Sequence, residues 1–462
     1  MSIAAPKTKP MLQLPTPLSA FVVSGAVFGF FHLTSPFSYV ERYEYSSWCL
    51  LGANLIALWG PVLYVGLKQR TLCHRLRTTD ASISAGSFFL NLGVWMMLSA
   101  AILGGLLKAY DLFFVRGLTL TANVNELYEQ NAEVSASIAG LIASLMYPLA
   151  YPTLVVVLAI RRVREKPSWI WRMATLLSLL AFAVAPLNAV VLGKRGAVFS
   201  VAILVTLAYF FFGMRVRLRT AALATIGGIV LLVFSSSMLR HRLELKGAST
   251  EGAVEVGRFT DLMLLSNEFR SIARHGGMPD GCRGAMYDWA AFHAYVVHAV
   301  PEYLHAVEQF NTAEHQYGKY TFSLAAKFFS YFVKVHYDAA ETASVPPRTY
   351  IYSTLFGPFY FDFGLFSPIA SFLLGLFFVS VYRFAEKTTF AVPLYLYLYT
   401  VMLLCPMISF IEMFYGFYYL VACIIGGIGL KFFSLIRRTN APPSRGFRPT
   451  RLHSKKSWFS VR

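Results

Sequence analysis

Long apolar stretches constrain the fold of this 462-residue chain more than any other feature. A helix that crosses the hydrocarbon core of a bilayer needs about 20 mostly apolar residues, and about ten stretches meet that requirement. These stretches are residues 18–35, 46–67, 83–106, 136–160, 174–193, 196–214, 220–238, 363–383, 389–408 and 412–434. The pattern predicts an all-α polytopic membrane protein with about ten transmembrane helices.

The composition agrees with a membrane protein. Hydrophobic residues make up 56% of the chain and charged residues only 14%, which excludes an ordinary soluble domain. The formal net charge of +18 would suit a nucleic-acid partner in a soluble protein. Here the cations gather in the short loops on one side of the predicted membrane, where the positive-inside rule accounts for them. We therefore expect no nucleic acid as a partner.

The charges of the loops predict the orientation of the chain. Cation-rich segments follow the second, fourth, sixth and eighth stretches, and the C-terminal tail is also basic. The loops between them hold more acids, so both termini are predicted to be cytoplasmic. The expected regions are an N-terminal membrane block (1–238), a polar region on the opposite side (239–350), a C-terminal membrane block (351–434) and a basic cytoplasmic tail (435–462).

The polar region from 239 to 350 is the only long polar interval of the chain. Two parts of it have apolar residues at helical spacing, Tyr287–Val307 and Phe322–Val333, and we expect both to be helices lying in the membrane interface. Pro301 is expected to interrupt the first of them. A membrane protein that has its long polar region on one side of the membrane is expected to act at that side.

Two basic clusters are predicted at the same side of the membrane as the polar region. Lys194 and Arg195 lie between two glycines, where a phosphate can approach the backbone and a guanidinium can bind two of its oxygens. Arg240, His241 and Arg242 would form an electropositive floor with an imidazole that can act as a base. The alternative for both clusters is a set of cations that anchors helix ends at the interface.

The polar region itself contains further candidates. Arginines that could bind a diphosphate or an acidic sugar are Arg258, Arg270 and Arg274. A carboxylate, an imidazole and an aromatic ring suited to a sugar follow at Glu314, His315 and Tyr317. The alternative is an ordinary polar turn.

The last candidates lie where the chain re-enters the membrane. Arg348 and Tyr350 precede the eighth stretch, Asp362 lies at its lip, and Glu412 lies at the outer end of the tenth. An acid at such a position is costly unless it is partnered or functional, and a structural ion pair is the alternative to a functional role. The five cysteines form no disulfide framework, and no metal-binding spacing is present, so neither a metal nor another cofactor is expected.

The order of motifs between residues 190 and 385 resembles the O-antigen polymerase (Wzy-type) family, also called oligosaccharide repeat unit polymerases. The resemblance rests on the GKRG turn (193–196), RHR (240–242), EHQYGKYTF (Glu314–Phe322), PPRTYIYSTLFGPFYFDFG (Pro346–Gly364) and Leu374-Gly375-Leu376. The resemblance implies a GT-C-like membrane fold in the bacterial inner membrane, with the polar region in the periplasm.

The resemblance also implies a reaction, in which a glycan is transferred from undecaprenyl pyrophosphate to the sugar of another lipid-linked repeat unit. The residues expected to bind the pyrophosphate are Arg195, Arg240, Arg242 and Arg348. The base that takes the proton of the acceptor hydroxyl is expected among His241, Glu314, His315 and Glu412. The expected partners are undecaprenyl-pyrophosphate-linked glycans, the lipid bilayer and a chain-length regulator protein.

Two other functions compete with polymerisation. An O-antigen ligase shares the long polar region and its basic residues, and the sequence barely separates the two activities. A transporter or flippase of lipid-linked sugars would instead show repeat symmetry and charges near the midplane. The chain has no obvious repeat, and its polar residues gather on one face.

Overall fold

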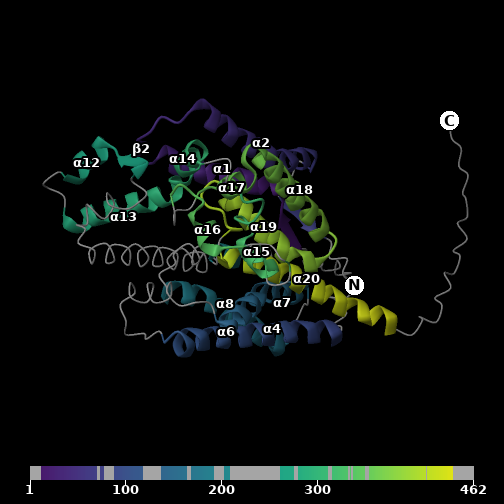
Figure 1. Cartoon of the computed structure of the whole chain (residues 1–462). Coiled ribbons are helices and arrows are strands. Elements are labelled where there is room, and N and C mark those ends of the chain that lie inside the picture. Colours follow the sequence, from purple (N-terminus) through teal and green to yellow (C-terminus); the bar gives the residue numbers. More distant parts are fainter. Residues whose placement is uncertain are drawn as a thin grey trace, which may run out of the picture.

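The computed structural model describes residues 12–69, 73–76, 88–117, 137–163, 168–191, 202–208, 261–274, 279–310, 315–330, 333, 337–348, 353–412 and 414–440. This part of the chain is mostly helical, as the apolar pattern predicts. Its helices form two neighbouring groups (Figure 1).

The first group contains helices from both ends of the chain. In Figure 1 it occupies the upper part of the molecule. Its members are α1 (Pro17–Leu33), α2 (Tyr45–Gln69), α17 (Phe356–Phe363), the 3-10 turn η5 (Gly364–Phe366), α18 (Ser367–Ala385), the 3-10 turn η6 (Thr389–Ala391) and α19 (Val392–Leu404). The helix α2 ends more than 280 residues before α17 begins. The core of this group therefore joins the N-terminal and C-terminal membrane blocks.

The second group lies below the first in Figure 1 and comes from the middle of the N-terminal block. Its members are α4 (Phe88–Tyr110), the π-helical turn η1 (Asp111–Val115), α6 (Ile138–Met146), the 3-10 turn η2 (Tyr147–Leu149), α7 (Ala150–Val163) and α8 (Trp169–Val191). The last helix, α20 (Phe414–Asn440), contacts α19 of the first group as well as α4 and α7 of the second. It therefore connects the two groups.

The polar region contributes shorter helices. They are α12 (Asn267–Arg274), α13 (Asp280–Val297), α14 (Ala299–Gln309), α15 (Ser323–Ser330) and α16 (Ala339–Ser344). The helix predicted over 287–307 breaks at His298, which caps both α13 and α14. Pro301 was expected to interrupt this helix, and the interruption lies three residues before it, so that Pro301 falls in the first turn of α14, where its missing N–H costs no hydrogen bond within that helix.

The helix α14 is not interfacial, contrary to the prediction. Its Val300, Tyr303 and Leu304 are buried in the main hydrophobic core, and the helix contacts α2 and α17. The prediction for α15 fits better, because none of its side chains is buried and Phe328 and Phe329 are exposed.

Two short antiparallel sheets, which the sequence did not predict, join distant segments. The strand β1 (Leu12–Pro15) pairs with β3 (Cys73–Leu76), and β2 (Phe37–Tyr39) pairs with β4 (Met263–Leu265). The second pair attaches the polar region to the segment between α1 and α2.

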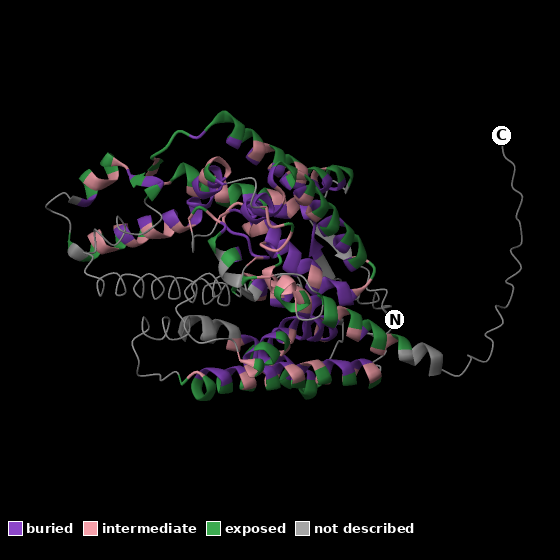
Figure 2. Ribbon diagram, in the orientation of Figure 1, coloured by how far each residue is buried: buried purple, intermediate pink, exposed green. Residues whose placement is uncertain are grey.

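The exposed surface of the helices is that of a membrane protein. Five helical segments of the described chain are long and apolar enough to cross a bilayer, at Tyr45–Lys68, Phe88–Val115, Ile138–Arg162, Phe356–Ala385 and Gly416–Leu435. Shorter apolar helices lie at Pro17–Leu33, Trp169–Val184 and Thr389–Leu404. Figure 2 shows the buried residues between the helices and the exposed ones on their outer sides. Large apolar side chains such as Ile56 (76% exposed) lie on these outer sides, which a bilayer accommodates and water would not.

The spans predicted at 220–238 and most of 196–214 lie outside the described residues. The apolar stretch that was predicted to end at residue 106 is longer in the structure. The helical segment that begins at Phe88 continues to Val115, and it includes the charged residues Lys108 and Asp111, which the prediction left in the following loop. Lys108 and Arg116 both bind the fully buried carboxylate of Asp111, at 3.4 and 3.1 Å. This pairing is what allows the charges to remain on a buried helix end.

The contact between α2 and α18 positions the functional region. An added Cβ at Gly375 would lie 2.3 Å from the carbonyl oxygen of Leu58, so only glycine permits this approach of the two helices. Asn54 of α2 donates to the hydroxyls of Tyr303 and Ser367 and accepts from Ser371. This buried and satisfied network fixes α2, α14 and α18 relative to one another.

Candidate functional site

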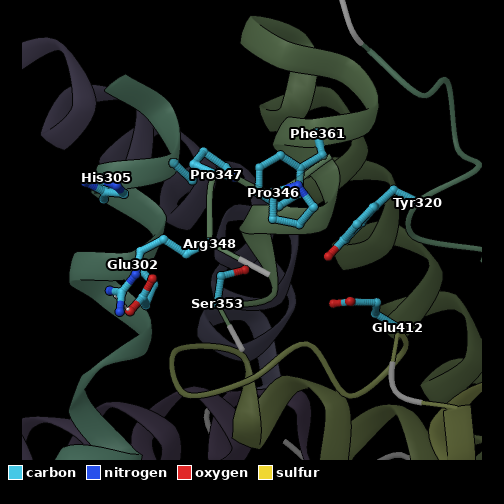
Figure 3. Close-up of a pocket in the computed structure, with 10 residues that line it drawn as sticks. Glu302, His305, Tyr320, Pro346, Pro347, Arg348, Ser353, Phe361 and Glu412 are labelled. Atoms are coloured by element: carbon cyan, nitrogen blue, oxygen red, sulfur yellow. Dashed lines mark hydrogen bonds and ion pairs between the residues drawn. The ribbon is translucent and has the colours of Figure 1, made fainter. Parts of the chain in front are cut away.

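An acidic pocket lies where α14, the segment before α17 and the turn before α20 meet. It is small, about 20 Å³, which is enough for about one water molecule or one hydroxyl group. The residues that line this pocket are Glu302, His305, Ala306, Tyr320, Pro346, Pro347, Arg348, Ser353, Phe361 and Glu412 (Figure 3).

One face of α14 supplies the first wall. Glu302, His305 and Ala306 are three and four residues apart, so they share a helix face. His305 Nδ1 lies 3.3 Å from the carboxylate of Glu41, which ties this face to the segment between α1 and α2.

Arg348 connects three segments that are distant in the sequence. Its Nη1 donates to Oε1 of Glu302 at 2.6 Å, and its Nη2 donates to Oδ2 of Asp261 at 2.7 Å. Only 14% of the Arg348 side chain and 6% of the Glu302 side chain are exposed, whereas that of Asp261 is 67% exposed. Neither of these acids was among the predicted ones, since the structural ion pair considered as an alternative concerned Asp362 and Glu412. The bond to Asp261 is the more easily exchanged, because that carboxylate is already solvated.

Burial acts strongly on the acids of the pocket. It raises the pKa of Glu302 to about 7, although the Arg348 cation opposes the shift. Burial also raises the pKa of Glu412 to about 7, although its hydrogen bond with Tyr320 opposes the shift. Two carboxyl groups that titrate near neutral pH thus share one small pocket with a single arginine, a property common in acid–base sites.

Glu412 and Tyr320 form the second wall. The Tyr320 hydroxyl points at the Glu412 carboxyl in Figure 3, and a hydrogen bond joins the two side chains. Glu412 lies in the turn between α19 and α20, and Tyr320 lies in the loop before α15. The pair therefore depends on how that loop is held.

Asp362 holds the loop. Its buried carboxylate accepts hydrogen bonds from the backbone N–H groups of Tyr320 at 3.0 Å and Thr321 at 2.8 Å. The backbone carbonyl groups of Phe361 and Asp362 accept two further hydrogen bonds, from the N–H groups of Gln316 and Tyr317 respectively. Asp362 was predicted to bind substrate, but its carboxylate faces backbone amides and does not line the acidic pocket.

Glycines permit the close approaches around this loop. Gly364 has φ +56°, and an added Cβ there would lie 2.4 Å from the His315 ring. His315 packs on this glycine and against the ring of Phe310, and its Nδ1 lies 3.4 Å from the carbonyl oxygen of Phe361. His315 is thus adjacent to the pocket without lining it.

Other predicted residues lie apart from the pocket. Tyr317 is 80% exposed, with φ +49°, at the turn of the loop. Arg270 and Arg274 lie on α12, which projects at the edge of the molecule in Figure 1, away from α17. Only the backbone of Arg274 is described. The structure therefore brings Arg348 and Glu412 into one pocket, with Asp362 and His315 close behind it.

Many of the predicted site residues lie outside the described part of the chain. They are Lys194, Arg195, Arg240, His241, Arg242, Arg258, Glu314 and Tyr350. Their roles stay predictions.

Sequence reasoning did not select Glu302, His305, Ser353 or Asp261. The signal for Glu302 was an acid directly after Pro301, inside an otherwise apolar run, Ala299–Leu304, that proves to be buried throughout. Nothing local marks Asp261, since its partner is 87 residues away along the chain. Among the described residues, no three His, Cys, Asp or Glu side chains gather as metal ligands.

An apolar groove of about 520 Å³ begins beside the acidic pocket. It runs between α1 and α2, and we call it the α1–α2 groove. On α1 its lining extends from Phe21 to His32, a length of about 16 Å at 1.5 Å per residue, or about half the thickness of a bilayer core. On α2 it includes Ile56 and Trp48, which are 76% and 40% exposed, so the groove opens towards the surrounding bilayer.

The groove and the pocket have no lining residue in common, but the same two segments contribute to both. Val300 lines the groove and Glu302 lines the pocket, two residues apart on α14. Thr354 lines the groove next to Ser353, which lines the pocket. The Ser353 hydroxyl lies against Gly357, where an added Cβ would clash with it, so the position of this side chain depends on a glycine. A molecule with an apolar tail could lie in the groove and place a single polar group at the pocket.

Comparison with known proteins adds no assignment. Protein-family models, curated proteins and solved structures were compared with the chain, and none of them matches it.

Proposed function

We propose that this protein is a membrane glycosyltransferase that polymerises lipid-linked oligosaccharide repeat units at the periplasmic face of the bacterial inner membrane. It transfers a glycan from undecaprenyl pyrophosphate onto the sugar of another lipid-linked repeat unit, in O-antigen or exopolysaccharide assembly. The fold is of the GT-C type with about ten spans, and both termini are cytoplasmic.

The observation that carries the proposal is that α14 and residues 353–354 line both the α1–α2 groove and the acidic pocket. A lipid-linked glycan has a long apolar chain and a polar head joined at a phosphate. The groove supplies apolar walls over about half the bilayer core, and the pocket at its end supplies ionisable groups. A water-soluble substrate would have no use for the groove.

Glu412 is the proposed base. Its ionised carboxylate takes the proton of the acceptor hydroxyl while Tyr320 orients that carboxylate. The acceptor oxygen then forms a bond to the anomeric carbon of the donor sugar. The bond from that carbon to the phosphate oxygen breaks, and the pyrophosphate leaves with the electron pair. General-base catalysis of this kind contributes about 10²–10⁴-fold to a rate.

Cations stabilise the leaving group in this proposal. Arg348 lies at the pocket, and the pyrophosphate displaces Asp261, the solvated partner of Arg348. A phosphate oxygen then accepts a hydrogen bond from the freed Nη2 of Arg348. Lys194, Arg195, Arg240 and Arg242, together with Arg258, are proposed to complete the pyrophosphate site. The pocket of about 20 Å³ admits one hydroxyl group, so the sugars lie outside it and only the reacting group enters.

The test is a glycan gel from cells that lack the gene, complemented with wild type, Glu412→Gln or Glu308→Gln. Glu308 is a matched control, because it lies on α14 outside the pocket and its carboxyl oxygen accepts from the Glu44 N–H, which glutamine can also do. We expect the ladder with wild type and Glu308→Gln, and one repeat unit on the acceptor with Glu412→Gln at an equal membrane level.

Other outcomes point to the competing functions. Accumulation of lipid-linked polymer in the deletion strain would indicate a ligase. Accumulation of lipid-linked repeat units on the cytoplasmic side would indicate a flippase. An unchanged ladder would refute a role in this glycan.

A further inference from the structure

The proposed reaction uses two opposite charges in one small pocket. Arg348 stabilises the leaving pyrophosphate, and Glu412 takes the proton of the acceptor hydroxyl. A cation beside a carboxylate lowers the pKa of that carboxylate and makes it a weaker base. Because the pocket measures only about 20 Å³, the guanidinium must be kept away from the base.

The guanidinium of Arg348 is turned away from Glu412. Figure 3 shows it beside Glu302 at one side of the pocket, whereas the Glu412 carboxyl lies at the opposite side and faces Tyr320. Nη1 of Arg348 donates to Oε1 of Glu302 at 2.6 Å. Although both acids line the same pocket, the Arg348 cation acts on the pKa of Glu302 and not on that of Glu412.

The surroundings of Glu302 suit it to hold this guanidinium. The next residue, Tyr303, is buried in the main core and accepts a hydrogen bond from Asn54 of α2, which fixes this part of α14. Only 6% of the Glu302 side chain is exposed, so water competes little for its carboxylate. Asp261, another partner of Arg348, is 67% exposed, and its ion pair is therefore the weaker of the two.

From this geometry we infer that Glu302 is a positioning residue, which holds Arg348 away from Glu412 so that one pocket contains both a cation and an effective base. The inference rests on the proposed function, which assigns Arg348 to the pyrophosphate and Glu412 to the acceptor hydroxyl. Without the carboxylate of Glu302, the long side chain of Arg348 is drawn to the other acid of the pocket.

Other titratable groups also surround the proposed base. Among the described residues they are Tyr320 from the loop before α15, Asp362 from α17 and His305 from α14. The charge of Glu302 does not itself act on the pKa of Glu412. A replacement of Glu302 therefore reaches Glu412 through the position of Arg348.

The test is the pH dependence of transfer by purified full-length protein in proteoliposomes with lipid-linked repeat units. Wild-type transfer should rise through about pH 7. In Glu302→Gln the guanidinium approaches Glu412, and an opposite charge within about 4–6 Å lowers the pKa of a carboxyl by about 1–3. We expect the midpoint of the profile to move down by about one pH unit or more, with a lower rate at the plateau.

Two controls separate this effect from damage to the fold and from loss of charge. Glu308→Gln makes the same change on α14 outside the pocket, so the midpoint should stay at that of wild type. The double variant Glu302→Gln/Arg348→Gln also removes the cation, so its midpoint should return to that of wild type. Damage to the fold would instead lower the rate at every pH without moving the midpoint.

Infrared difference spectroscopy gives the same titration for variants that transfer little. The band of the protonated Glu412 carboxyl is identified by its loss in Glu412→Gln, and its intensity is followed with pH in the absence of substrate. We expect this titration to move to lower pH in Glu302→Gln and not in the double variant.

An unchanged midpoint in Glu302→Gln, or a shift that persists in the double variant, would overturn the inference and leave the proposed function standing. If wild type forms no product, the proposed function fails. The infrared titration then still decides whether Glu302 holds Arg348 away from Glu412.

Discussion

Replacement of Asp362 by asparagine is expected to detach the loop that carries Tyr320. The Asp362 carboxylate accepts two backbone hydrogen bonds, from Tyr320 and Thr321, and is fully buried. A hydrogen bond to a charged group contributes about 1.5–3 kcal/mol. Asparagine can keep one of the two bonds through Oδ1, but it turns an NH₂ donor towards the other N–H.

The expected loss is therefore about 2–4 kcal/mol in the free energy that holds the loop closed. That corresponds to an increase of about 30-fold to 700-fold in the opening equilibrium of the loop. Hydrogen exchange followed by mass spectrometry measures this directly, because the amides of a segment exchange when it opens. We expect faster exchange in a peptide that covers 316–322, with little change in peptides from α18.

Asp338→Asn is the matched control for this experiment. Asp338 is exposed, and its carboxylate accepts from the N–H of Glu341 at 3.4 Å at the start of α16. Asparagine caps helices about as well as aspartate, so exchange in 316–322 should not change. If Asp362→Asn leaves the protection of that peptide as it is in wild type, Asp362 does not hold the loop.

Four further outcomes are expected. Gly364→Ala should reduce the yield of monodisperse protein in size-exclusion chromatography, because φ is +56° and the added Cβ would lie 2.4 Å from the His315 ring; a normal yield would contradict this. Arg348→Lys should shorten the glycan ladder at an unchanged membrane level, because an ammonium group cannot bond both carboxylates as a planar fork does; a full-length ladder would argue against it. Transfer should rise with pH through about pH 7, because burial raises the pKa of Glu412 to about 7 and only its ionised form accepts a proton; a flat profile would exclude it as the base. In intact spheroplasts, a membrane-impermeant maleimide should label a variant whose only cysteine is the exposed Cys282, because the polar region is proposed to be periplasmic. Labelling only after lysis would reverse the proposed orientation.

The apolar pattern predicted most of the fold, because a bilayer permits few backbone arrangements. The helices α1, α2, α4 and α20 begin within a few residues of the predicted stretches. The pattern failed where tertiary contacts decide. Lys108 and Asp111 remain in a helical segment because they form an ion pair at its end. The position of α14 depends on the hydrogen bond between Tyr303 and Asn54.

The candidate site was predicted only in part, for a similar reason. An acid at a membrane lip is noticeable in any sequence, so Asp362 and Glu412 were both selected. The sequence does not show which of them turns towards backbone amides and which towards a pocket. That difference arises from the loop at Tyr320, whose contacts with α17 are about 40 residues distant along the chain.

The most direct test of the central claim is polymerisation by the purified protein. Wild type, Glu412→Gln and Glu308→Gln would be reconstituted in proteoliposomes with lipid-linked repeat units, and the glycans would be separated by length. We expect products of two or more repeat units, with release of undecaprenyl pyrophosphate, for wild type and Glu308→Gln, and none for Glu412→Gln. Polymer formed equally by Glu412→Gln would contradict the proposed site, and no polymer from wild type would contradict the proposed function.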